Sequence, residues 1–307
     1  MNTALVTGGT GFIGEALIPA LQQRGYRVLL LTRKPDAARQ RYPEAQPFRD
    51  WRELGDICPE VVINLAGEGI ADKRWTDARK QVLRESRIGV TRSLVDWCAT
   101  RQTAPRVMVS GSAIGYYGDC GDEWVDENSP AGHDFAARLC SEWESAARPV
   151  RVLGTRLAIV RIGLVMGPGG MLKRLLLPFR LGLGGRLGPG TQWMSWIERG
   201  DLVRLILALT DSHEAEGIFN AVAPNPVTNE DFTRVLARTL KRPAMLPVPA
   251  WLLRTLMGEL AELLLASQRV RASRMEWLPG FRFRFTGIEK AITHHLPQLT
   301  GNAKVQL

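Results

Sequence analysis

Glycines follow the first apolar run of the chain at a spacing typical of a dinucleotide site. Residues 3–7 form that run, and Gly8, Gly9, Gly11 and Gly14 lead into a helical pattern that begins at Phe12. Such glycines permit a tight turn, let the backbone approach a pyrophosphate and let the helix pack on the sheet. The first N–H groups of the helix then face the phosphates. Residues 7–14 therefore predict a dinucleotide site, the alternative being a plain glycine turn.

The end of the second apolar run indicates which dinucleotide is bound. An acidic residue about 20 positions on would hold the ribose 2′-hydroxyl of NAD. The chain instead reads Leu31-Thr32-Arg33-Lys34, without an acid. A hydroxyl and two cations suit a 2′-phosphate, so we expect NADP(H). The alternative is an exposed basic turn.

Short β-rich runs alternate with helical stretches through the first half of the chain. Strands are expected at residues 3–7, 27–31, 61–65, 107–110 and 157–162, and helices at 12–24, 76–100 and 135–147. This alternation is typical of parallel strands joined by crossover helices. We expect an α/β fold of the Rossmann type, a doubly wound parallel sheet covered on both faces.

The second half is less regular. Residues 163–190 are rich in glycine and read as a long excursion from the sheet. Helical patterns follow at 202–209, 229–240 and 251–265, and the alternation at 281–285 predicts a strand with one buried and one solvated face. We expect an NADP-binding domain over 1–165, to which later segments can return, and a smaller substrate-side α/β region over 166–307.

Composition narrows the class of protein. The 307 residues are 45% hydrophobic and 23% charged, which excludes a disordered chain, and the net charge of +9 suits a small anionic substrate. The four cysteines form no CxxC pair, so we expect reduced thiols in a cytoplasmic protein and no metal site. No apolar run is long enough to span a membrane, and we expect no membrane partner. Arginines near Trp277 could bind single strands, but the strand alternation favours no nucleic acid.

Several motifs together resemble an extended short-chain dehydrogenase/reductase, and more narrowly its atypical, epimerase-like subgroup. The subgroup is often labelled as sugar-nucleotide epimerases and carries a C-terminal domain of unknown function. The resemblance rests on residues 7–14, Asn64-Leu65-Ala66-Gly67-Glu68, Lys73-Arg74-Trp75, Ser86-Arg87, Ser110-Gly111-Ser112, Tyr116-Tyr117-Gly118, residues 177–185 and residues 247–292.

The resemblance implies positions for the cofactor. The pyrophosphate would lie at the glycine-rich turn, the 2′-phosphate at the end of the second strand, the adenine and ribose after the fourth, and the nicotinamide after the sixth. The implied residues, with Arg87 added for a contact to phosphate or ribose, are Gly8, Thr10, Gly11, Phe12, Ile13, Gly14, Thr32, Arg33, Leu65, Ala66, Arg87 and Val165.

The catalytic pattern of the family is incomplete in this chain. These enzymes pair a serine with a Tyr-x-x-x-Lys helix, in which lysine lowers the tyrosine pKa for proton transfer. Ser112 fits the serine position, but the helix offers Ala136 and Cys140, or Phe135 and Leu139 one residue earlier. The asparagine position of the family holds Arg87.

Other groups could transfer the proton. Tyr116 or Tyr117 could supply a phenol, and Cys140 a thiolate, with a packed apolar residue as the alternative for the cysteine. The predicted catalytic residues are Ser112, Cys140 and Tyr117. Two functions remain open: an NADP(H)-dependent oxidoreductase or epimerase-like enzyme, and a non-catalytic NADP(H)-binding sensor or regulator.

Overall fold

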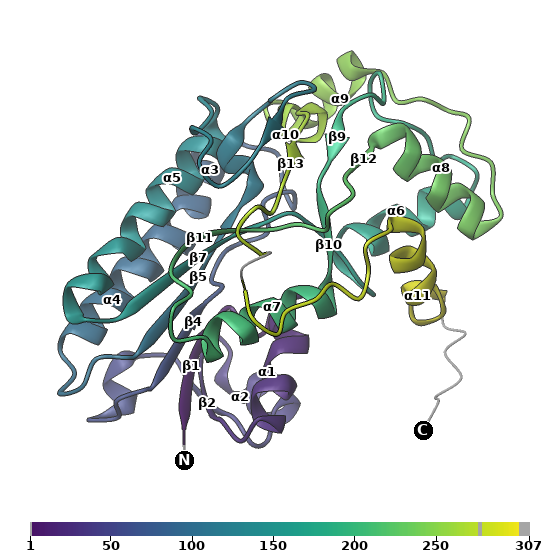
Figure 1. Ribbon diagram of the computed structural model, residues 1–307. Helices are drawn as coiled ribbons and strands as arrows, with labels where there is room; N and C mark the ends of the chain where they lie inside the picture. The colour runs from purple at the N-terminus through teal and green to yellow at the C-terminus, as the bar shows by residue number, and fades with distance from the viewer. Residues whose placement is uncertain (1, 276–277, 301–307) are drawn as a thin grey trace.

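A seven-stranded parallel sheet forms the centre of the protein (Figure 1). The structure is a computed structural model that describes residues 2–275 and 278–300. The strands lie in the order β11-β7-β5-β4-β1-β2-β3. Their bounds are β1 Thr3–Thr7, β2 Arg27–Leu31, β3 Gln46–Phe48, β4 Val61–Asn64, β5 Val107–Ala113, β7 Arg156–Ile162 and β11 Gly217–Ala221. The predicted Rossmann-type fold is confirmed, and β11 returns to the sheet from the second half of the chain.

Helices cover both faces of this sheet (Figure 1). One face carries α1 (Gly14–Gln23), α2 (Pro35–Arg41) and α7 (Arg199–Asp211), and the other carries α3 (Asp77–Arg84), α4 (Val90–Ala99) and α5 (Phe135–Ala147). Along β1, Ala4 and Val6 pack with the first group, whereas Leu5 packs with the second. Strands apolar on both sides are what a sheet buried on both faces requires.

A π-helix, η2 (Glu85–Gly89), interrupts the long helical stretch expected between β4 and β5. The segment therefore runs as α3, one wide turn and α4 rather than as one helix. Such turns inside α-helices frequently lie at functional sites. Here the turn brings Ser86 and Arg87 against the loop after β4, where Ser86 accepts a hydrogen bond from the N–H of Glu68 at 3.1 Å.

A buried polar network fixes the carboxyl ends of the central strands. The hydroxyl of Thr7 donates to the amide oxygen of Asn64 at 2.7 Å, and the amide nitrogen of Asn64 donates to Thr91 and Ser110. Thr7 also accepts from the N–H of Ala66 at 3.2 Å. These bonds join β1, β4, β5 and α4, so they hold the loop after β4 in place.

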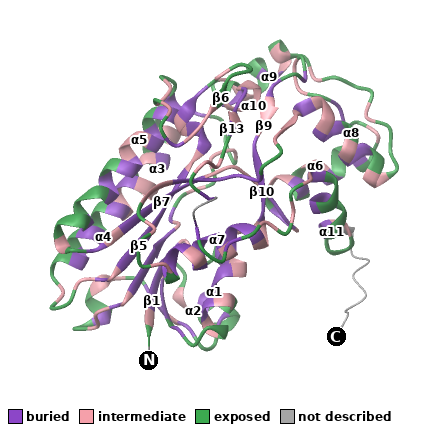
Figure 2. Ribbon diagram, in the orientation of Figure 1, coloured by how far each residue is buried: buried purple, intermediate pink, exposed green. Residues whose placement is uncertain are grey.

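A second lobe lies beyond the carboxyl edge of the sheet (Figures 1 and 2). It contains β8 (Leu164–Met166) paired with β10 (Trp196–Glu198), β9 (Trp193–Met194) paired with β12 (Val227–Thr228), and β13 (Arg269–Val270) paired with β6 (Trp124–Val125). Its helices are α6 (Gly170–Arg180), α8 (Asn229–Leu240), α9 (Ala250–Met257), α10 (Leu260–Leu265) and α11 (Ile288–Thr300). Residues 163–190 are thus partly ordered as β8 and α6 rather than a plain excursion.

The strand expected at residues 281–285 is wrong. This segment is extended but belongs to no sheet, because the buried carboxylate of Asp201 accepts the backbone N–H groups of Arg284 and Phe285 at 2.9 and 3.0 Å. Phe281 and Phe283 pack edge to face against each other, and both contact the core. The alternation of phenylalanine and arginine therefore reflects burial. The backbone N–H groups of this segment bind Asp201 on α7 rather than a neighbouring strand.

None of the helices among the described residues is both long enough and apolar enough to cross a membrane.

Candidate functional site

A cavity of about 880 Å³ opens at the carboxyl edge of the sheet, above β1, β2 and β4. Ten of the predicted cofactor residues line it: Gly8, Thr10, Gly11, Phe12, Ile13, Thr32, Arg33, Leu65, Ala66 and Val165. The cavity thus extends from the glycine-rich turn to the ends of β2, β4 and β8. Its residues are those that a dinucleotide lying across the edge of the sheet would contact.

The glycine-rich turn is shaped by close backbone approaches. Gly8 has φ of +70°, and a Cβ there would overlap the carbonyl of Leu65. Gly14 does not line the cavity, but a Cβ there would overlap the backbone of Gly9. No side chain caps the N-terminus of α1, and the N–H groups of Glu15, Ala16 and Leu17 donate to backbone carbonyls, so the positive end of the helix can meet an anion through the N–H groups of residues 12–14.

Basic side chains gather at one end of the cavity, around the end of β2. Arg33, Lys34, Arg41 and Arg49 line it there. Arg33 forms an ion pair of 2.7 Å with Glu68, and Arg49 donates to the carbonyl of Arg33 at 2.9 Å. The set can hold a phosphate, because guanidinium groups bind its oxygens by charge-assisted hydrogen bonds. Arg41 and Arg49 were not predicted, since neither lies next to a recognisable motif.

Arg87 lies behind the cavity rather than on its lining. Its guanidinium donates to the carbonyl of Glu68 at 2.9 Å and lies 5.3 Å from the centre of the Trp143 ring. Burial lowers the pKa of Arg87, but the group remains a cation at neutral pH. The structure therefore brings Arg87 to the loop after β4, where it acts on the site through Glu68.

Ser112 lies at the end of β5, and its hydroxyl donates to the carboxylate of Glu144 on α5 at 2.8 Å. Arg161 on β7 binds the same carboxylate through Nε and Nη2, at 2.8 and 3.0 Å. Both side chains of this ion pair are only 1% exposed. Burial by itself would lower the pKa of Arg161, but the bonds to Glu144 outweigh that effect and raise it. The serine thus belongs to a buried charged network that the sequence did not predict.

Tyr117 and Cys140, the other two predicted catalytic residues, are both buried. The hydroxyl of Tyr117 donates to Asn220 at 2.7 Å and accepts from Arg161 at 3.0 Å. Burial raises the pKa of Tyr117 to about 12 and that of Cys140 to about 12. At these pKa values both groups are protonated near neutral pH, which favours the alternative considered for Cys140, a packed thiol.

Tyr116 is the more exposed of the two neighbouring tyrosines. Its ring lies over the guanidinium of Arg161, with 3.4 Å between the guanidinium carbon and the ring centre. The residue is half-buried, beside Val222 and Val270. Tyr116 is thus attached to the Arg161 network while part of it remains accessible.

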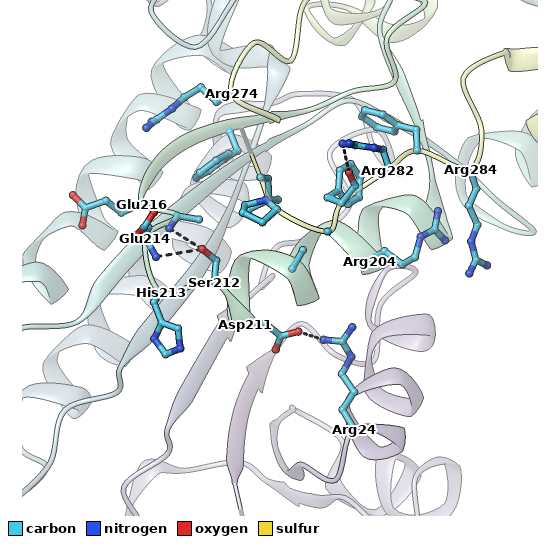
Figure 3. Close-up of a pocket in the computed structure, with 18 residues that line it drawn as sticks. Arg24, Arg204, Asp211, Ser212, His213, Glu214, Glu216, Arg274, Arg282 and Arg284 are labelled. Carbon is cyan, nitrogen blue, oxygen red and sulfur yellow. Dashed lines mark hydrogen bonds and ion pairs between the residues drawn. The ribbon is translucent and has the colours of Figure 1, made fainter. Parts of the chain in front are cut away.

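A second cavity, of about 1010 Å³, lies near the amino end of β11 and the C-terminus of α7 (Figure 3). Its arginines are spread around the wall, and several are already bound. Arg24 pairs with Asp211, Arg274 donates to the carbonyl of Ile218 at 3.3 Å, and Arg282 donates to that of Phe281 at 3.2 Å. The predicted site residues lie elsewhere. Within residues 2–275 and 278–300, no group of three potential ligands could hold a metal ion.

Two families match the chain. Residues 4–221 match the NAD dependent epimerase/dehydratase family, and residues 248–295 match a domain of unknown function, DUF1731.

Similar curated proteins are described as epimerase family proteins. One from Mycobacterium bovis is 40% identical over 292 residues, covering 94% of this chain and 95% of that protein. The mouse protein SDR39U1 is 36% identical over 297 residues, covering 94% and 97%.

Solved structures agree with these matches. The crystal structure of human epimerase family protein SDR39U1 with NADPH superposes with a TM-score of 0.86 at 34% identity, covering 95% of this chain and 98% of that one. A structure of UDP-galactose 4-epimerase superposes with a TM-score of 0.77 at 21% identity, covering 98% and 99%. The second likeness shows the shared fold alone.

Proposed function

Because the chain belongs to the NAD dependent epimerase/dehydratase family, as an atypical short-chain dehydrogenase/reductase with a DUF1731 domain, we propose that it is an NADP(H)-dependent reductase of a small molecule. The single observation that carries this proposal is the cavity at the carboxyl edge of the sheet, where ten predicted cofactor residues and four basic side chains line one space.

The cavity at the carboxyl edge of the sheet fits NADP(H). Gly8 and the open N-terminus of α1 would hold the pyrophosphate, and Arg33, Lys34 and Arg49 would hold the 2′-phosphate. Val165 would face the nicotinamide end. The NADPH in the human relative supports this choice of cofactor. When bound, NADPH supplies a hydride.

The protonation of the predicted catalytic residues favours reduction over epimerisation. Oxidising a sugar hydroxyl needs a base to take its proton. Cys140 and Tyr117 hold their own protons, and the hydroxyl of Ser112 donates its hydrogen bond to Glu144. We therefore propose an acceptor that needs no acid from the enzyme, such as a quinone or a conjugated carbonyl compound. It gains a hydride from the cofactor and a proton from water, and NADP⁺ is left.

The pH dependence of turnover tests the absence of a titrating side chain. With the pKa of Tyr117 and of Cys140 raised to about 12, neither changes its charge near neutrality. We expect kcat with a quinone acceptor to stay within about threefold between about pH 6 and pH 9. Stopped-flow measurement of NADPH oxidation checks this. A bell-shaped profile that Tyr116→Phe abolishes would identify a working phenol instead.

Deuterium transfer from labelled NADPH tests the reaction itself. We expect deuterium at the β-carbon of conjugated carbonyl acceptors, NADPH consumption without retained label for quinones, because hydroquinone O–D exchanges with water, and no label in a panel of sugar nucleotides. Ser112→Ala should leave the transfer rate within about threefold, because Ser112 donates to Glu144 rather than to substrate. Tight NADPH binding without transfer to any acceptor would favour the second candidate function, a non-catalytic NADP(H)-binding sensor. That candidate is favoured by the buried network of Ser112, Glu144, Arg161 and Tyr117.

Exchanging Arg33 for aspartate tests the 2′-phosphate site. We expect the affinity for NADPH to fall about a hundredfold while that for NADH changes little, because the change removes a charge-assisted bond and adds a repulsive charge. Fluorescence titration measures both constants. Arg148→Asp is the matched control, since Arg148 is an exposed arginine in η4 (Arg148–Leu153), near the amino end of β7. An unchanged NADPH preference in Arg33→Asp would show that the phosphate lies elsewhere.

The oxidation state of the cysteines is informative about the cellular compartment of the protein. All four are free thiols, two of them buried. Free thiols suit a reducing compartment, and we propose the cytoplasm.

A further inference from the structure

Six large apolar side chains of the second lobe are exposed within two segments, residues 177–183 and 245–251. Between 54% and 81% of each residue is exposed, although such residues are normally buried. They are Leu177, Leu181, Leu183, Met245, Leu246 and Trp251, and we call them the outer apolar surface. None of them lines either cavity described above.

Backbone contacts between residues 185–188 and 246–248 hold the two segments side by side. The N–H of Val248 donates to the carbonyl of Arg186 at 2.9 Å, and the N–H of Gly188 donates to the carbonyl of Val248 at 2.8 Å. A Cβ at Gly185 would overlap the carbonyl of Leu246. The loop between α8 and α9 forms the outer margin of the second lobe and is largely exposed (Figures 1 and 2). Exposed apolar residues that gather in this way mark an interaction site.

The same segments carry only positive charge. Residues 170–190 and 232–258 contain nine lysines and arginines and no aspartate or glutamate, which equals the net charge of +9 of the whole chain. Five of these nine side chains are exposed and form no ion pair with any described residue: Lys173, Arg180, Arg238, Lys241 and Arg242. Five free cations thus accompany the six apolar side chains.

We propose that the outer apolar surface binds the surface of a bilayer that contains anionic phospholipid. The free cations would meet the lipid phosphates, and the leucines, Met245 and Trp251 would enter the boundary between headgroups and acyl chains. This is binding at the membrane surface, without a membrane-spanning helix. It departs from the expectation drawn from the sequence, which considered spanning segments only.

Charge and side-chain type favour lipid over other partners. A second copy of the chain would place cations against cations, which is unfavourable. A nucleic acid would satisfy the cations but would leave the aliphatic side chains without a partner, because single strands are held by stacking on aromatic rings. A bilayer with anionic headgroups satisfies both the cations and the aliphatic side chains.

Vesicle co-sedimentation of the full-length protein tests the proposal. We expect binding to vesicles of phosphatidylcholine with phosphatidylglycerol, weak binding to phosphatidylcholine alone, and weaker binding at high salt. Lys241→Gln with Arg242→Gln should lower the partition coefficient about tenfold or more. Leu183→Ser with Met245→Ser should lower it by a similar factor, because their insertion is lost.

Matched controls separate these effects from misfolding. Val152→Ser with Arg148→Gln removes an exposed apolar residue and an exposed cation from η4, and should leave vesicle binding unchanged. All variants should keep the thermal midpoint and NADPH affinity of the parent. Failure to bind anionic vesicles, or binding that the Leu183/Met245 pair does not reduce, would overturn the proposal. So would tighter binding to single-stranded DNA than to vesicles, or self-association that depends on Met245.

Discussion

Replacing Arg161 with methionine is expected to lower the free energy of unfolding by about 3–5 kcal/mol. The change leaves the carboxylate of Glu144 buried without its counter-charge and without two of its hydrogen bonds. Glu144→Leu should lower the free energy of unfolding by a similar amount, because it leaves the guanidinium of Arg161 buried without its counter-charge. Chemical denaturation monitored by tryptophan fluorescence measures both effects.

The double variant Arg161→Met with Glu144→Leu should recover most of that loss, because a buried ion pair can often be exchanged for apolar side chains at little net cost. The control is an ion pair whose carboxylate, Glu142, lies on the same helix as Glu144. Arg84 pairs with Glu142 near the surface, with both side chains more than a third exposed, so Arg84→Met should cost less than about 1 kcal/mol. A loss for Arg161→Met as small as that for Arg84→Met would contradict the assigned burial of the pair.

The buried pair also tests the proposed function. Arg161 supports Tyr116 and Tyr117 but lines neither cavity, so we regard it as a positioning residue. If the double variant is folded and binds NADPH with the parent's affinity, a fall in kcat without a change in KM would indicate that the network positions the reacting partner. Unchanged kcat would assign it a structural role alone.

Exchanging Gly8 for alanine should weaken NADPH binding by about a hundredfold or more, which corresponds to about 2.7 kcal/mol. The added Cβ would overlap the carbonyl of Leu65, and the residue would have to keep a φ of +70° that an alanine rarely adopts. Either the turn or the loop after β4 must move, and both line the cofactor cavity. Calorimetric titration with NADPH measures the change.

Gly25→Ala provides the matched control for this prediction. Gly25 has a similar φ of +79°, but nothing lies within 4 Å of an added Cβ. The Gly25→Ala substitution should therefore lower stability, because alanine must adopt this backbone conformation, and it should leave NADPH affinity unchanged. Equal NADPH affinities for Gly8→Ala and Gly25→Ala would show that the Gly8 turn does not shape the cofactor cavity.

Local patterns predicted five of the seven strands, and together with the family resemblance they predicted much of the cofactor cavity. Strand and helix periodicities extend over neighbouring residues, and the glycines of residues 7–14 act through the conformation of their own backbone. Ten of the predicted cofactor residues accordingly line one cavity. The prediction that NADP(H) is bound also began locally, with Arg33 and Lys34 at the end of one strand.

The interactions of the side chains at the site depend on contacts between segments that are distant in the sequence. Ser112 meets Glu144 and Arg161 only because β5, α5 and β7 pack together, and that packing turns a predicted catalytic serine into part of a buried ion network. Arg49 reaches the cavity through β3, whose three residues carry too short a pattern to predict. Residues 281–285 form no strand, because the carboxylate of Asp201, about 80 positions away, accepts two of their backbone N–H groups. Periodicity within a segment determines what it can form, whereas the partners of buried polar groups are decided by which segments the completed fold brings together.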